Sequence, residues 1–108
     1  MKQGKTTEKE IKKMLEEATV DCYGEYEEFT GIFCYLADNM SFPFKAMVLG
    51  DEIEVIGLDE DRSSIGRGLI TKILKNDNEY KIDLAELETN NTKNKKFLEM
   101  YKYWIGNF

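Results

Sequence analysis

The sequence predicts one α+β domain, in which two N-terminal helices and one C-terminal helix pack against short antiparallel strands that form a curled sheet or a small SH3-like barrel. Apolar residues recur at helical spacing near both ends of the chain, and between residues 44 and 84 they alternate with polar residues. With 108 residues, of which 42% are hydrophobic, the chain can bury one modest core but not two. We therefore expect a single domain over residues 1–108, with any disorder confined to residues 1–6.

The N-terminal part of the chain carries two helical patterns. Thr7 and Glu10 have the spacing of a capping box, and the apolar stripe behind them predicts a first helix from Thr7 to Ala18. Gly24 interrupts the pattern, and the acidic residues after it suit the positive end of a second helix, which ends near Asn39. The stripe of this second helix consists of Phe29, Ile32, Phe33, Leu36 and Met40.

The middle of the chain predicts an antiparallel meander of four strands. Each run alternates apolar with polar residues or is bounded by turn residues such as Gly50 and Asn76. The four runs are Phe44 to Val48, Ile53 to Val55, Leu69 to Leu74 and Tyr80 to Leu84.

The C-terminal part returns to a helical pattern. Phe97, Met100, Tyr101 and Trp104 stand at positions i, i+3, i+4 and i+7, which predicts a last helix packed against the sheet. We expect the polar run from Asn90 to Lys96 before this helix to be a loop. The aromatic residues near the C-terminus either form an exposed surface for a partner or cover the core, and we favour the second interpretation.

The composition excludes several classes of function. A net charge of −6 works against binding to nucleic acid. The absence of histidine excludes His-based catalysis and the usual zinc ligand sets, and no pair of nucleophile and base indicates an enzyme. No segment approaches the ~20 apolar residues of a membrane span, and the N-terminus lacks the apolar region of a signal peptide. Cys22 and Cys34 are too few for a disulfide framework, so we expect a cytoplasmic protein.

An acidic turn is the main candidate metal-binding segment. Asp59, Glu60, Asp61 and Ser63 follow the second predicted strand, and the oxygens at positions 59, 61 and 63 have the alternate spacing that lets a tight loop turn several donors toward one hard cation. An EF-hand would need glycine at the sixth position and glutamate at the twelfth, where this chain has serine and isoleucine. The alternative, a solvated connection between two strands, fits these residues equally well.

Asp38 is a candidate to complete this site, because calcium takes six to eight oxygens and one turn rarely supplies them. It lies at the negative end of the second predicted helix, where a bound cation would offset the unfavourable charge; alternatively, it pairs with a nearby lysine. Asp21, Glu25 and Glu28 form a second, weaker acidic cluster. Because Glu28 and Asp38 are ten residues apart, about 15 Å along a helix, the two clusters would be two separate sites.

The order of short motifs along the chain resembles that of the small calcium-binding proteins without EF-hands that were first described in cyanobacteria. The motifs are DxYGExE from Asp21, LxDN from Leu36, FPFKA from Phe42, GDEIEVIGLDED from Gly50, YKIDLAELE from Tyr80 and YKYWI from Tyr101. The resemblance covers most of the chain after Val20. It implies calcium as the ligand and supports the calcium role of Asp38 and of the turn. The chain departs from the family at Ala37, where the relatives carry an acid, and this removes one potential ligand.

The resemblance therefore implies a bacterial calcium-binding protein that buffers or senses the ion. Together with the composition, it leads us to expect a cytoplasmic protein that is not an enzyme. The expected partners are the calcium ion and, for a sensor, another protein; we expect neither nucleic acid nor membrane. The alternative is a metal-free interaction module that uses an acidic face or the aromatic C-terminal helix.

Overall fold

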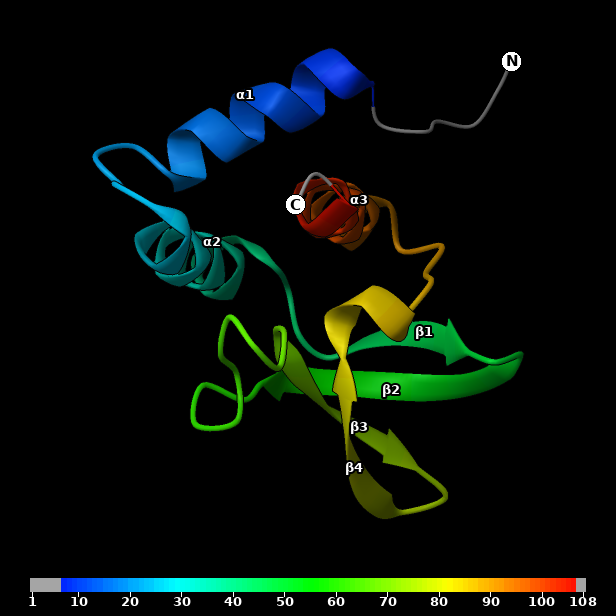
Figure 1. Cartoon of the computed structure of the whole chain (residues 1–108). Coiled ribbons are helices and arrows are strands. Elements are labelled where there is room, and N and C mark those ends of the chain that lie inside the picture. Colours follow the sequence, from blue (N-terminus) through cyan, green and yellow to red (C-terminus); the bar gives the residue numbers. More distant parts are fainter. Residues whose placement is uncertain (1–6, 107–108) are drawn as a thin grey trace.

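The computed structural model describes residues 7–106 and confirms the predicted α+β class (Figure 1). The expectation about residues 1–6 lies outside the described residues. Every predicted helix and strand is present, with some ends shifted. In chain order the elements are α1 (Glu8–Ala18), α2 (Glu25–Asn39), β1 (Phe44–Val48), β2 (Asp51–Leu58), β3 (Ile70–Lys75), β4 (Asn78–Asp83), the 3₁₀ helix η1 (Leu84–Glu86) and α3 (Thr92–Gly106).

Helices α1 and α2 begin where the sequence predicts. The Glu10 backbone N–H donates to Thr7 Oγ1 at 3.2 Å, and the Thr7 N–H donates to Glu10 Oε1 at 3.1 Å, which completes the capping box of α1. α2 begins after Gly24, whose φ of 92° is unfavourable for residues with a side chain. The first turn of α2 contains three glutamates, where the helix dipole favours negative charge.

The sheet is a meander with the strand order β1-β2-β3-β4, and all neighbouring strands are antiparallel. Within the described residues the sheet does not close into a barrel, so the SH3-like alternative is not confirmed. A register shift between Val55 and Gly57 marks a bulge in β2. Outside the sheet, Met47 of β1 and Glu88 exchange two backbone hydrogen bonds of 2.7 and 3.0 Å, which cover part of the outer edge of β1.

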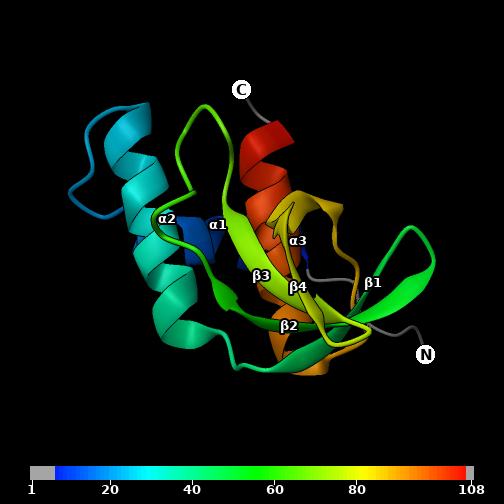
Figure 2. The ribbon, with the colours of Figure 1, turned by 90° about the horizontal axis from the view of Figure 1, so that it is seen from below.

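The helices cover one face of the sheet (Figures 1 and 2). α2 and α3 lie next to the sheet, and α1 packs against both of them on the side away from it. The core between these layers includes Ile32 and Leu36 of α2, Ile73 of β3 and Tyr101 of α3, each at most 2% exposed. Within residues 7–106, no helix is both long and apolar enough to cross a membrane.

α3 begins inside the polar run that we predicted to be a loop. The side-chain oxygen of Asn91 accepts the Asn94 N–H, and its carbonyl accepts the Lys95 N–H, both at 2.9 Å, so a polar N-cap starts the helix at Thr92. Asn94 is fully buried and exchanges two hydrogen bonds with the backbone of Ser41, at 3.0 and 2.8 Å. The loop prediction was therefore wrong from Thr92 onward, because polar residues here cap and anchor the helix.

Aromatic residues of α3 pack inward. Tyr101 is 1% exposed and Trp104 is 8% exposed, and the Trp104 ring lies 6.1 Å from the ring of Phe29 in α2. These residues cover the core rather than form an exposed aromatic surface. Phe108 lies outside the described residues.

Candidate metal centre

The acidic turn after β2 is folded around Asp59. The Asp59 N–H donates to the Ile70 carbonyl at 2.8 Å, so the turn opens from the end of the ladder between β2 and β3. Asp59 Oδ1 accepts the Arg62 N–H at 3.2 Å, and the Asp59 carbonyl accepts the Ser63 N–H at 3.1 Å. These bonds from one aspartate close the turn over residues 59–63, as Asp side chains commonly do.

Ser63 clamps the base of this turn. Its hydroxyl donates to the Asp59 carbonyl at 2.7 Å and accepts the Ile70 N–H, also at 2.7 Å. A serine hydroxyl has one proton and two lone pairs, so these two bonds leave a single lone pair for a cation. The main contribution of Ser63 in this arrangement is to hold the backbone of the turn.

Glu60 and Asp61 are the exposed acids of the turn. Neither carboxylate makes a hydrogen bond or an ion pair within the part of the chain that the structure describes. Their side chains can therefore reorient toward a cation without breaking a contact of the protein.

Asp59 differs from these two acids because it faces the protein's own positive charges. Its side chain is only 11% exposed, and Oδ2 lies 3.6 Å from Arg62 Nε and 3.6 Å from Lys81 Nζ. Lys81 also pairs with Glu79 at 2.8 Å. The hydrogen bond with Glu79, more than the neighbouring charge of Asp59, raises the pKa of Lys81 and keeps its ammonium group charged.

The end of the loop is fixed to the helical layer by Tyr101, which we had assigned only to the core. The Leu69 N–H donates to the Tyr101 hydroxyl at 2.9 Å, and this hydroxyl donates to Asp83 Oδ1 at 3.3 Å. Gly68 has a φ of +90°, and a β-carbon there would collide with Asp83 Oδ2. The positive φ of Gly68 cannot be predicted from the sequence Gly66-Arg67-Gly68. The attachment of this loop to Tyr101 and Asp83 was therefore not predictable.

The structure places Asp38 in the last turn of α2, where it is exposed. The loop that follows the acidic turn meets the other end of this helix, because Ile65 and Gly68 line a cavity of about 310 Å³ together with Glu25 and Phe29. Asp38 forms no ion pair within residues 7–106, so the predicted alternative of a lysine partner finds no support.

The second predicted cluster lies partly against α3. Glu28 Oε1 accepts the indole N–H of Trp104 at 3.4 Å, and Glu25 lines the cavity that Trp104 also lines. Asp21 is exposed in the connection between α1 and α2, with a φ of 61°. Glu25 and Glu28 thus both lie near Trp104. Within residues 7–106, however, they do not form a metal-binding group with Asp21.

The donors fit calcium in kind but are not gathered into a complete coordination sphere. Carboxylate, hydroxyl and carbonyl oxygens are the ligands that calcium takes, six to eight at a time. Within residues 7–106, however, no three side chains of His, Cys, Asp or Glu come together closely enough to hold a metal ion. The structure therefore does not join Asp38 to the turn, and an ion at the turn needs carbonyl oxygens or water besides the acids.

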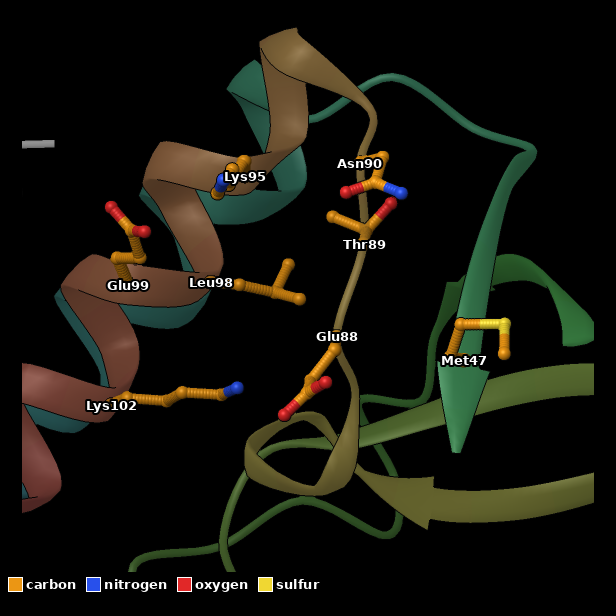
Figure 3. A pocket seen from close by; sticks show the side chains of 8 residues that line it. All are labelled: Met47, Glu88, Thr89, Asn90, Lys95, Leu98, Glu99 and Lys102. Carbon is orange, nitrogen blue, oxygen red and sulfur yellow. The ribbon is translucent and has the colours of Figure 1, made fainter. Parts of the chain in front are cut away.

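A further cavity lies elsewhere, between α3 and residues 88–90 (Figure 3). Its volume is about 510 Å³, and Leu98 and Lys102 of α3 point across it toward that segment. Lys102 Nζ donates to the Leu87 carbonyl at 2.7 Å. None of the predicted metal-binding residues lines this cavity.

Comparisons with known proteins identify a family for this chain and solved structures with the same fold. A family model described as calcium binding, Calci_bind_CcbP, matches residues 12–105. The crystal structure of Anabaena CcbP has a TM-score of 0.77 at 19% identity and covers 97% of this chain and 95% of that chain. A calcium-binding protein solved in the calcium-binding form has a TM-score of 0.76 at 20% identity, with 90% of each chain covered. At these identities the two structures establish the shared fold. No curated protein matches the sequence.

Proposed function

Because the chain belongs to the CcbP family of calcium-binding proteins, we propose that it binds calcium through acidic side chains outside any EF-hand. The match of the family model to residues 12–105 is the observation that carries this proposal. Within the fold, the turn of Asp59, Glu60, Asp61 and Ser63 is the principal candidate site, because it combines free carboxylates with a fixed backbone.

The other predicted acids enter the proposal as separate donors. Asp38 lies at the C-terminal end of α2, and the cluster of Asp21, Glu25 and Glu28 lies at its N-terminal end. Neither has three acidic residues in succession, as residues 59–61 do, so we assign weaker binding to both. Calcium can bind such partial sites through water, at lower affinity.

Buffering and sensing are the two finer roles that calcium binding allows. A sensor needs a surface that changes with the ion, and the bonds of Tyr101 to Leu69 and Asp83 provide a physical link from the loop to α3. The alternative function is a metal-free interaction module. Because Tyr101 and Trp104 are buried, such a module would bind its partner through the acidic face and not through the aromatic C-terminal helix. The cytoplasm remains the proposed compartment, in line with the free thiols of Cys22 and Cys34.

Calorimetric titration of the metal-free protein with calcium tests the proposal. We expect saturable binding, weaker competition by magnesium, whose octahedral geometry the open turn supplies poorly, and a rise in melting temperature with calcium. No heat and no shift in melting temperature up to about millimolar calcium, the weak end of protein calcium affinities, would refute calcium binding.

The variant Asp61→Asn locates the site, because it removes one charge without breaking a described hydrogen bond or ion pair. We expect calcium affinity to fall roughly tenfold, about 1.4 kcal/mol. The matched control is Asp77→Asn in the turn between β3 and β4. Asp77 has a φ of 68°, a conformation that asparagine also adopts readily. Equal losses in both variants would indicate diffuse attraction of cations rather than a site at the turn.

A further inference from the structure

We propose that Lys81 acts as a tethered cation that lowers the calcium affinity of the turn by competing for Asp59. The inference rests on the proposed calcium function and adds to it a residue that sets affinity. It starts from the position of Asp59, the one buried carboxylate among residues 7–106.

The carboxylate of Asp59 has little free space for an incoming cation. Oδ1 accepts the Arg62 N–H, and Oδ2 faces Arg62 Nε and Lys81 Nζ, each at 3.6 Å. A divalent ion at Oδ2 would meet two positive charges in a partly desolvated place, where screening by water is weak. Binding therefore requires these groups to withdraw.

Lys81 is the stronger of the two competitors. Its side chain is 32% exposed, compared with 63% for Arg62, so its charge is less screened. The register of the sheet pairs Lys81 with Lys72 of β3, which fixes the backbone from which Lys81 reaches toward the turn. The competitor is thus built into β4 rather than into the turn itself.

Glu79 makes the withdrawal of Lys81 possible. It accepts the ammonium group of Lys81 at 2.8 Å, closer than Asp59 does. When the ammonium group leaves Asp59, it keeps one carboxylate partner and its flexible stem accommodates the shift. Lys81 therefore exchanges with a cation at Asp59 instead of blocking the carboxylate permanently.

The experiment compares Lys81→Gln with Lys75→Gln by calcium titration of the whole chain. Lys75 pairs with Asp51 at 2.9 Å on the same sheet, so its replacement removes the same charge without touching Asp59. We expect Lys81→Gln to raise calcium affinity several-fold above wild type, and Lys75→Gln to change it by less than about twofold. Equal affinities of the two variants, with calcium still bound by wild type, would overturn the inference and leave the proposed function intact.

A second measurement does not depend on calcium. Urea unfolding is measured in the presence of a calcium chelator for wild type, Lys81→Gln, Asp59→Asn and the double variant. These four proteins form a double-mutant cycle. We expect the two losses of stability to be non-additive, since the variants share one contact; strict additivity would refute that contact. If wild type binds no calcium but Lys81→Gln does, the inference is supported while the proposed function of the natural chain fails. If neither binds calcium, both fail.

Discussion

Tyr101 joins the end of the loop that follows the acidic turn to the helical layer through one hydroxyl group. This group accepts the N–H of Leu69 and donates to Asp83. We predict that Tyr101→Phe lowers the free energy of unfolding by about 1–3 kcal/mol, because the variant leaves the buried N–H of Leu69 without an acceptor. Urea unfolding measures this loss. Tyr103→Phe is the matched control: its hydroxyl bonds Glu8 at an exposed position, so we expect a loss below about 1 kcal/mol.

The same hydroxyl predicts a dependence of stability on high pH. Burial raises the pKa of Tyr101 from about 10 to about 12, so the folded protein holds the proton more tightly than the unfolded chain. The stabilisation is fully present below pH 10 and is lost as the pH rises toward 12. Two pKa units correspond to roughly 3 kcal/mol. Unfolding measured across this range should show a steeper loss for wild type than for Tyr101→Phe; parallel curves would contradict the assignment.

Individual residues also show where sequence reasoning about the site ends. The acidic turn was recognisable because its oxygens are adjacent in sequence, but Ser63 was predicted only as a ligand. Its hydroxyl proton is engaged by the Asp59 carbonyl. Lys81 was missed because it is 22 residues from Asp59 and reaches it only through the fold. Spacing reveals donors within one segment, whereas contacts between segments depend on register and rotamers that periodicity does not determine.

At the scale of elements, Gly68 sets how the loop returns to β3. Its φ of +90° is unfavourable for alanine, and an added β-carbon would collide with Asp83. We predict that Gly68→Ala destabilises the protein by more than about 1 kcal/mol. The control is Gly66→Ala, because a β-carbon at Gly66 meets nothing within 4 Å. Thermal unfolding of both variants checks this, and similar melting temperatures would show that the loop adapts to the added methyl group.

The elements themselves were predictable wherever apolar periodicity was strong. The stripe of α2 and the alternation in β1 gave nearly correct bounds. β2 extends to Leu58, beyond its predicted apolar centre, because backbone pairing with β3 continues across the bulge. α3 starts earlier than predicted because Asn91 caps it. Closure of the sheet depends on strand register and twist over long distances in sequence, which explains why a curled sheet and a small barrel could not be separated in advance.

At the scale of the whole molecule, the negative charge is concentrated in one segment. Residues 14–44 contain seven of the 21 acidic residues and none of the 15 lysines and arginines, so the rest of the chain has 14 acidic and 15 basic residues. This segment runs from the end of α1 through α2, along one side of the fold (Figure 2). Such a field raises the local concentration of cations, and the repulsion within it opposes folding.

The concentration of charge predicts that a single reversal inside the segment stabilises the protein. Glu16 is exposed in the last turn of α1, which has no basic residue there, and the helix dipole disfavours a carboxylate at this end. Glu16→Lys should therefore raise the free energy of unfolding by up to about 1 kcal/mol at low salt. At about 1 M salt, where the screening length is about 3 Å, most of this gain should disappear. Glu86→Lys changes the charge equally outside the segment, on an exposed residue of η1. An equal gain in this control would mean that stability follows the net charge of −6 and not its concentration around α2.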